Sequence, residues 1–271
     1  LLMEASSEYA NKRNIYIASI PDMKVESIYS EEDGRNTTSW IWSSEWIDEE
    51  HVALTSDKDG YNHLYSLQLK NGEVRQITSG KWEIFRIYPA TQAKAKSKAN
   101  LKEFYFIANK SRPENRALFK VNSDSGNIER IASRDGVYRP FISPTGKNIC
   151  VLFSDDMTPF DLYYIQDSNL QRISSSPQSG FHNYLWAKTE YLDIESKKDD
   201  SNIKVKILYP SEFDPGKKYP AIIGSVYANA VLNQWGGRSA HPTWGLDQYL
   251  VQSEKYILMN VDIRGSRGYG R

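Results

Sequence analysis

A pattern of paired short strands recurs about every 50 residues, and it limits the possible architectures more than any other feature of this sequence. In each repeat an aromatic residue anchors an apolar strand, a turn follows, and a second strand ends in isoleucine. The anchors lie 49, 54 and 44 residues apart and the isoleucines 49, 54 and 42 apart; they are Tyr16, Tyr65, Phe119 and Tyr163, and Ile28, Ile77, Ile131 and Ile173. A β-sandwich would account for the strands but not for this period, which is typical of the four-stranded blades of a β-propeller.

Turn-forming residues separate these strands. Asp57-Lys58-Asp59-Gly60, Asn71-Gly72 and Asp135-Gly136 are examples. The stretch 91–100, rich in Lys and Ala, is interpreted as a solvated insertion between strands. We therefore predict a partial β-propeller of about four blades over residues 1–180. Because propellers usually contain more blades, we expect others before Leu1 in a longer parent protein.

Residues 181–271 follow a different pattern. Two alternating runs, 191–194 and 203–208, are joined by a polar loop and predict a hairpin. The apolar run 221–226 predicts a buried strand, and 256–261 predicts a second strand followed by a glycine-rich loop. Between them, 244–254 fits an amphipathic helix, whose apolar members are Trp244, Leu246, Leu250 and Val251. A strand, a crossover helix and a strand begin a doubly wound α/β domain, in which ligands bind at the carboxyl ends of the strands.

The composition argues against several classes of function. Lys plus Arg equals Asp plus Glu, at 34 each, so no basic field attracts nucleic acid or an anionic membrane. No apolar run approaches the roughly 20 residues of a membrane span, and no signal peptide is visible. Cys150 is the only cysteine, which excludes an internal disulfide. The histidines are scattered and are interpreted as loop or strand residues, so we expect neither a metal nor another cofactor; they are His51, His63, His182 and His241.

Several short motifs, taken in their order and spacing, resemble those of one peptidase family. They are Ser56-Asp57-Lys58-Asp59-Gly60-Tyr61-Asn62-His63-Leu64-Tyr65, Gly80-Lys81-Trp82-Glu83-Ile84, Lys218-Tyr219-Pro220, Val226-Tyr227-Ala228, Trp235-Gly236-Gly237 and Asp262-Ile263-Arg264-Gly265-Ser266. With them the chain resembles the prolyl oligopeptidase (S9) family of serine peptidases, and within it the dipeptidyl peptidase IV branch. The resemblance covers nearly the whole chain. It implies a partial β-propeller at 1–180, followed at 181–271 by the first part of an α/β-hydrolase domain.

The resemblance implies peptide-bond hydrolysis through an acyl-enzyme, with a Ser nucleophile, a His base and an orienting Asp. No Gly-x-Ser-x-Gly occurs in the chain. We therefore expect the triad to follow Arg271, and we expect the 271-residue chain to be inactive by itself.

Tyr227 takes the place of the tyrosine that the family uses as an oxyanion-hole donor. A phenol with a pKa of about 10 can donate to a developing oxyanion and keep its proton at neutral pH. The alternative is that Tyr227 packs beneath its own loop. The turn Tyr227-Ala228-Asn229-Ala230 also departs from the glycine-rich turn that is usual in the family.

Four other polar residues are interpreted as structural. Glu49 and Glu50 resemble the paired glutamates that hold the substrate's amino terminus in the dipeptidyl peptidase branch. They run directly into a strand of a late blade, so we predict a solvated turn and expect the amine-binding pair before Leu1. Asp262 and Arg264 are expected to hold the glycine-rich loop through hydrogen bonds.

Three functions stay open at this point. The first is a serine peptidase that binds short, extended peptides and releases amino-terminal dipeptides. The second is a non-catalytic binding protein on the same scaffold, and the third is an acylaminoacyl-peptidase or esterase of related architecture. A peptide substrate is the expected partner. The sequence leaves open a homo-oligomer, the residue preference and the compartment, which is periplasmic, extracellular or cytoplasmic.

Overall fold

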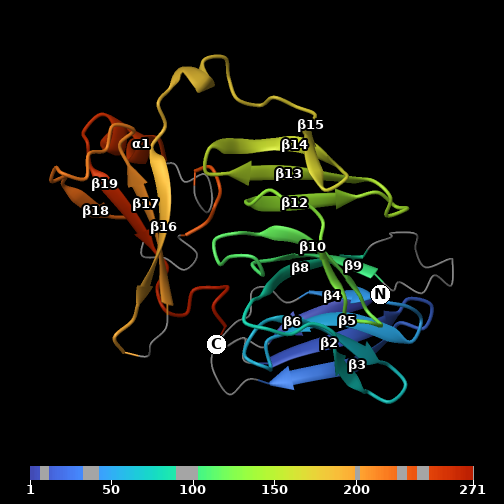
Figure 1. The fold of residues 1–271 in the computed structure, drawn as a ribbon. Coiled ribbons are helices and arrows are strands. Elements are labelled where there is room, and N and C mark those ends of the chain that lie inside the picture. The colour runs from blue at the N-terminus through green and yellow to red at the C-terminus, as the bar shows by residue number, and fades with distance from the viewer. Residues whose placement is uncertain are drawn as a thin grey trace.

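The computed structural model describes residues 1–6, 12–32, 43–89, 103–198, 202–224, 231–236 and 244–270. Within these ranges the strands form four antiparallel sheets in chain order, called the sheet stack below, and a fifth, mixed sheet (Figure 1). The first sheet of the stack contains β1 (Leu2–Ser6), β2 (Lys12–Ser19) and β3 (Lys24–Glu32). The second contains β4 (Ser44–Trp46), β5 (His51–Ser56), β6 (His63–Gln68) and β7 (Val74–Gln76). The third contains β8 (Ile84–Pro89), β9 (Glu103–Ala108), β10 (Ala117–Asn122) and β11 (Ile128–Arg130), and the fourth β12 (Val137–Ile142), β13 (Ile149–Asp155), β14 (Thr158–Gln166) and β15 (Asn169–Arg172).

Three of the four aromatic anchors occupy equivalent positions in successive sheets, which confirms the repeat for the second to fourth sheets. The first repeat departs from it, because Tyr16 lies in β2 of a three-stranded sheet and Ile28 lies inside β3. Tyr65, Phe119 and Tyr163 lie in β6, β10 and β14, the third strand of their sheets. The isoleucines that close these repeats each come directly after the fourth strand; they are Ile77, Ile131 and Ile173.

Alternation along the third strands lets each inner sheet bury both of its faces. Successive side chains of a strand point to opposite faces. Phe119 therefore packs in one cluster with Leu64 of the second sheet, whereas its neighbour Leu118 packs in another with Phe153 of the fourth. Tyr65 in the same way joins the cluster between the first and second sheets. The core of the stack thus consists of three apolar layers, one between each pair of neighbouring sheets.

The fifth sheet contains β16 (Lys188–Glu195), β17 (Asn202–Tyr209), β18 (Ala221–Ile223) and β19 (Ile257–Val261), in the order β16-β17-β19-β18. β16 and β17 form the predicted hairpin. β18 and β19 are parallel, and the helix α1 (Trp244–Gln252) lies between them in the chain, so the predicted strand, helix and strand are present. A link with a short 3-10 helix, η1 (Phe181–Asn183), connects the stack to this sheet, which stands beside it (Figure 1).

Two expectations about this second part are wrong in detail. The strand at 221 was expected to be buried, but Ile223 is 64 % exposed. Ile223 pairs with Met259, whereas the neighbouring Leu258, which points to the opposite face of the sheet, packs with Val251 of α1. Leu246 was expected on the inner face of the helix and is 54 % exposed. Val251 is buried as expected, but the polar Gln248 also faces inward, and its Oε1 accepts the Ala187 N–H at 2.9 Å. A polar side chain with a backbone partner has taken the position expected for an apolar one.

Two further expectations are not decided by the fold. The insertion at 91–100 lies outside the described residues. The division of the chain between residues 180 and 181 stays a prediction.

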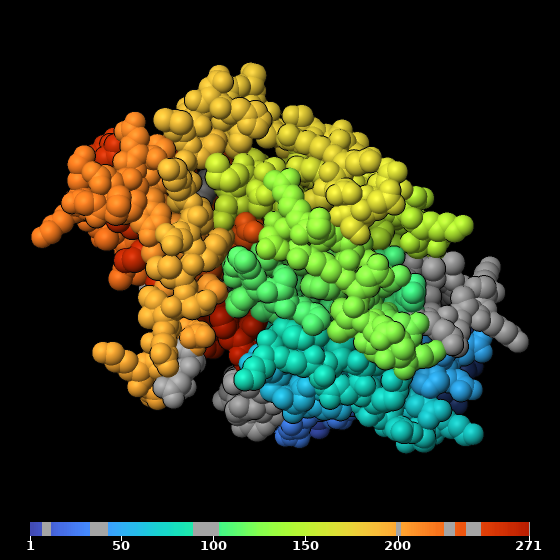
Figure 2. All heavy atoms as spheres, in the orientation of Figure 1, coloured from blue at the N-terminus to red at the C-terminus, as the bar shows by residue number. Residues whose placement is uncertain are grey.

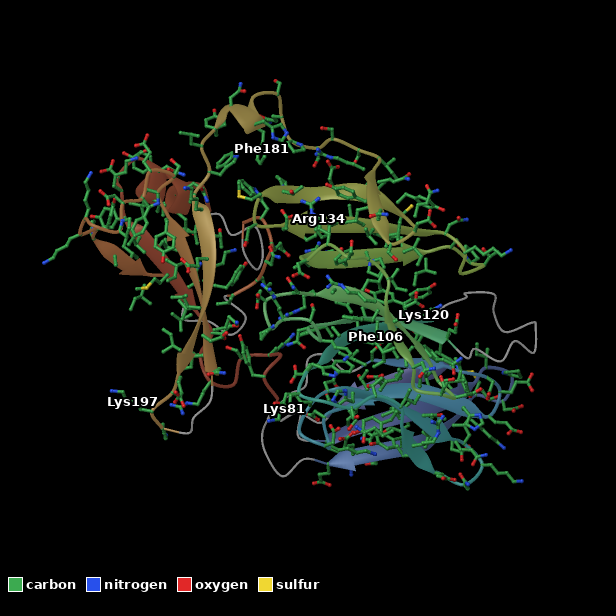
Figure 3. All side chains as sticks on the ribbon, viewed as in Figure 1. Lys81, Phe106, Lys120, Arg134, Phe181 and Lys197 are labelled. Carbon is green, nitrogen blue, oxygen red and sulfur yellow. The ribbon has the colours of Figure 1, made fainter. Side chains whose placement is uncertain are left out.

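Truncating the ring at the centre of the stack gives a direct test of this core. Phe106, labelled in Figure 3, is fully buried and stacks between Trp82 and Phe119, with ring centroids 5.9 and 5.5 Å away. Phe106→Ala should therefore lower the free energy of unfolding by about 3–5 kcal/mol. Phe141→Ala is the matched control, because that ring is 57 % exposed, and it should change the value by less than about 0.5 kcal/mol. Urea unfolding of the 271-residue chain measures both, and equal losses would contradict this core.

Candidate functional site

The loops that follow β18 and β19 begin at the same edge of the fifth sheet, because these two strands are parallel. Tyr227, the predicted oxyanion-hole donor, belongs to the first loop and lies outside the described residues. Val231, four residues further on, is described, and its backbone N–H donates to Asp262 Oδ1 at 3.1 Å. The end of the first loop is therefore tied to the start of the second.

Asp262 is buried and anchors the glycine-rich loop 262–270, in agreement with the structural role expected from the sequence. Its Oδ2 accepts a hydrogen bond from the Tyr269 hydroxyl at 2.8 Å, and its own N–H donates to the Lys204 carbonyl at 3.0 Å. Burial, together with the nearby carboxylate, raises the pKa of the Tyr269 phenol, which stays protonated and able to donate at neutral pH. Arg264 is exposed, and its Nη1 lies 3.5 Å from Ser196 Oγ.

Two residues of the sheet stack hold the other end of this loop. Glu83, between β7 and β8, accepts the N–H of Gly268 through Oε2 at 2.7 Å and the N–H of Gly270 through Oε1 at 3.1 Å. Asn109, directly after β9, donates from Nδ2 to the Gly268 carbonyl at 2.7 Å, and its Oδ1 accepts the Glu83 N–H at 2.7 Å. The C-terminal segment consequently lies between the stack and the fifth sheet, where it is visible in red (Figures 1 and 2).

Buried charge surrounds this contact. Burial raises the pKa of the Glu83 carboxyl, and the two backbone N–H donors oppose that rise. The Arg116 guanidinium lies 3.8 Å from the centre of the Phe85 ring and donates to the carbonyl oxygens of Pro113 and Asn115, both at 2.7 Å. Burial lowers the pKa of Arg116 to about 10, against the pull of nearby Asp262, so the group is still a cation at neutral pH.

An ion pair between the buried Lys206 and the largely buried Asp156 joins the fourth sheet to the fifth. Asp156, in the turn between β13 and β14, accepts hydrogen bonds from Lys206 Nζ through Oδ1 and from the Tyr191 hydroxyl, at 2.6 Å, through Oδ2. Lys206 Nζ also donates to the Leu232 carbonyl at 2.9 Å. Burial, and then the Asp156 carboxylate, raise the pKa of the Tyr191 phenol, which holds this donor in its protonated form.

The segment 231–236 lies against two turns of the stack. The Asn233 N–H donates to the Glu114 carbonyl at 2.9 Å, and its side-chain oxygen accepts the Asp156 N–H at 3.0 Å. The Trp235 N–H donates to Ser154 Oγ at 3.0 Å. The third and fourth sheets of the stack, and the link between the second and third, therefore contact the loops of the fifth sheet.

A cavity of about 290 Å³ lies beside the link between the two parts, and Phe181, His182, Met157, Arg134 and Arg172 are among its lining residues. Phe181 and Arg134 are labelled in Figure 3. Its two guanidinium groups are compensated, since Arg134 pairs with Asp155 and Arg172 with Asp161. Among the residues that the structure describes, its lining contains the imidazole of His182 but no serine, cysteine or aspartate.

The histidines and the two glutamates considered in the sequence analysis make local structural contacts or lie in exposed turns, where the structure describes them. His63 Nε2 lies 2.9 Å from the Gly80 carbonyl, and burial lowers its pKa. His51 Nδ1 lies 2.9 Å from Asp48 Oδ1, and His241 lies outside the described residues. Glu49 and Glu50 are exposed in the turn between β4 and β5, as expected of a solvated turn.

The described residues form neither a candidate metal site nor a helix that could span a membrane. No group of three or more His, Cys, Asp or Glu side chains there could hold a metal ion. Among the same residues, no helix is both long enough and apolar enough to cross a membrane.

Sequence reasoning missed the residues that join the two parts. Glu83 was visible only as a member of the motif Gly80-Lys81-Trp82-Glu83-Ile84, and Asp156 was not indicated by any pattern. The indication that was available is polarity inside an otherwise apolar context, as in Lys206 between Val205 and Ile207 of β17. Its partner could not be found, because it lies 50 residues away in the chain.

Removing both partners of the ion pair should lower the free energy of unfolding by less than the sum of the two single removals. Asp156→Ala should lower the free energy of unfolding by about 3–5 kcal/mol, because it removes the carboxylate that compensates the buried ammonium of Lys206. The double variant Asp156→Ala/Lys206→Met should lose at least about 1 kcal/mol less than the sum of the two single losses. Denaturant unfolding of the wild type, the two single variants and the double variant completes this double-mutant cycle. Strictly additive losses would refute the coupling between Asp156 and Lys206.

The sequence of this chain is similar to those of known dipeptidyl peptidases. Residues 38–160 match the family model of the dipeptidyl peptidase IV N-terminal region. The dipeptidyl peptidase 4 of Trichophyton equinum is 25 % identical over 93 % of this chain and 33 % of its own length. Prolyl endopeptidase FAP of Bos taurus is 24 % identical over 81 % of this chain and 29 % of its own. The chain thus spans about a third of the length of these relatives.

A solved structure shares the fold over the whole chain. The crystal structure of Porphyromonas gingivalis dipeptidyl peptidase 4 superposes with a TM-score of 0.77 at 18 % identity, covering 100 % of this chain and 37 % of that one. The four-stranded sheets of the stack correspond to the N-terminal propeller of such proteins. The family-model match, the relatives and the shared fold thus show that the chain is similar in sequence and in fold to dipeptidyl peptidase IV-like proteins.

Proposed function

We propose that the chain forms part of a serine peptidase that hydrolyses peptide bonds of short peptides and releases amino-terminal dipeptides. The relatives it matches carry the names dipeptidyl peptidase 4 and prolyl endopeptidase, which supports a peptidase of this family. In this proposal the Ser/Asp/His triad and the glutamates that bind the substrate's amine come from residues outside the 271 present here.

The observation that carries the proposal is the position of the two loops after β18 and β19. They leave one edge of a parallel strand pair, they are tied to each other through Val231 and Asp262, and the second is held against the sheet stack by Glu83. Ligands of open α/β sheets bind outside the carboxyl ends of parallel strands. We infer that residues 181–271 begin an α/β-hydrolase domain, that residues 1–180 are propeller blades, and that peptide binds between them.

The proposed chemistry at this edge is acyl transfer. A serine oxygen attacks the scissile carbonyl, histidine takes its proton and later returns it to the leaving amine, and water then hydrolyses the acyl-enzyme. Tyr227 is proposed to donate its phenolic O–H to the carbonyl oxygen as that oxygen becomes negative. A neutral donor placed in advance stabilises the developing charge without reorganisation during the reaction.

Replacing this donor should affect the chemical step. In the full-length protein, Tyr227→Phe should lower kcat on the order of 10²-fold and change KM much less, as for the loss of one oxyanion donor. Tyr249→Phe is the control, because that phenol is exposed and bonds Glu254 on the surface of α1. Steady-state cleavage of an X-Pro chromogenic dipeptide measures both, and an unchanged kcat in Tyr227→Phe would assign this ring to packing.

The chain alone should have no peptidase activity, because it contains no Gly-x-Ser-x-Gly segment. The purified 271-residue chain should leave the chromogenic dipeptide intact and should not react with a serine-directed covalent inhibitor. Turnover that such an inhibitor abolishes would contradict the placement of the triad. A full-length protein that binds peptide without cleaving it would instead support a non-catalytic binding protein.

A further inference from the structure

Glu83 uses its whole carboxylate on the backbone of another part of the chain. Each of its oxygens accepts one N–H, from Gly268 at 2.7 Å and from Gly270 at 3.1 Å, and the side chain is buried. These partners are 185 and 187 residues away in sequence. Two backbone amides that converge on one carboxylate form a concave anion site, in which the charge assists both hydrogen bonds.

The two glycines fit this contact because they carry no side chain. A Cβ on Gly268 would lie 2.6 Å from Asn109 Nδ2, and one on Gly270 would lie 2.8 Å from the Gly60 carbonyl oxygen. Both have a positive φ, of 100° and 80°, which favours glycine. Gly265 also has a φ of 80°, but a Cβ there would have nothing within 4 Å. The loop therefore packs closely against the sheet stack at Gly268 and Gly270, but not at Gly265.

The contact extends toward the edge of the fifth sheet through described residues only. Tyr269 lies between the two glycines, and its hydroxyl donates to Asp262 Oδ2 at 2.8 Å. The other oxygen of Asp262 accepts the Val231 N–H at 3.1 Å. Glu83, the loop and Asp262 thus form one connected set of buried and partly buried hydrogen bonds, from the stack to the end of the first loop and the start of the second.

We propose that Glu83 is a positioning residue: it fixes the 262–270 loop against the sheet stack and through that loop shapes the site at the carboxyl ends of β18 and β19. It acts without touching substrate. The part of this inference that concerns the site rests on the proposed function, whereas the part that concerns the loop does not.

Amide exchange in the full-length protein tests the loop directly. Glu83→Gln keeps the size of the side chain but offers one acceptor for two N–H donors. Exchange in peptides covering 262–270 should become about tenfold faster or more, while β9 and β10 keep their wild-type rates. Glu73→Gln, an exposed glutamate in the turn before β7, should leave all of these rates unchanged. Unchanged exchange across 262–270 in Glu83→Gln would overturn the proposal.

If the Glu83→Gln variant does not fold, two glycine substitutions in the loop test the same contact. Gly268→Ala and Gly265→Ala both place alanine at positive φ, so they share the backbone strain, and only the first collides with Asn109. Gly268→Ala should speed exchange across 262–270 clearly more than Gly265→Ala. Equal effects of the two substitutions would show that the contact with the stack does not hold the loop.

Kinetics separate this inference from the proposed function. If the full-length protein cleaves the chromogenic dipeptide, Glu83→Gln should lower kcat severalfold with little change in KM, because Glu83 contacts the loop and not the substrate. Faster loop exchange with an unchanged kcat would refute the coupling to the site. If the wild-type protein has no peptidase activity, the proposed function fails, and the exchange measurements still decide whether Glu83 holds the loop.

Discussion

The packing of one sheet's face on the next is the constraint on which the rest of this structure depends. Twisted antiparallel sheets have two faces, and an inner sheet of the stack must bury both. The chain meets this need by alternation, with Phe119 directed to the preceding sheet and Leu118 to the following one. Because each sheet relies on its neighbours for a core, their strands lie in a regular succession. That succession brings loops far apart in sequence to one side of the stack, where the fifth sheet is held.

The contact between the stack and the fifth sheet has a different physical character. Buried carboxylates occupy its key positions, Glu83 on two backbone amides and Asp156 on Lys206 and Tyr191. Burying such charges is costly unless each is paired and hydrogen-bonded, so only one relative placement of the two parts satisfies them all. Apolar packing would tolerate sliding between the parts, whereas this arrangement does not. A site built from loops of the fifth sheet and faced by the stack needs such a fixed placement.

Several strands were predictable from local sequence patterns, whereas the predictions of side-chain burial that proved wrong have a common cause. Periodicity located the strands around Tyr65, Phe119 and Tyr163, as well as the hairpin of β16 and β17. Which side chains are buried was harder to predict. Ile223 is apolar yet exposed, whereas the polar Gln248 faces inward and accepts a backbone N–H. Whether an apolar side chain is covered depends on which elements lie over it, and alternation within a single strand does not contain that information.

The sequence by itself determined the blade repeat, the strand–helix–strand order and the family resemblance around motifs such as Asp262-Ile263-Arg264-Gly265-Ser266. These follow from local periodicity, turn chemistry and short spacings, which a linear chain records directly. Only the tertiary structure decided that Glu83 meets Gly268 and Gly270, and that Asp156 meets Lys206. Their separations of 50 to 187 residues leave no periodic trace. The partner of a buried charge is set by the geometry of the folded chain, because leaving a desolvated charge unpaired is strongly unfavourable.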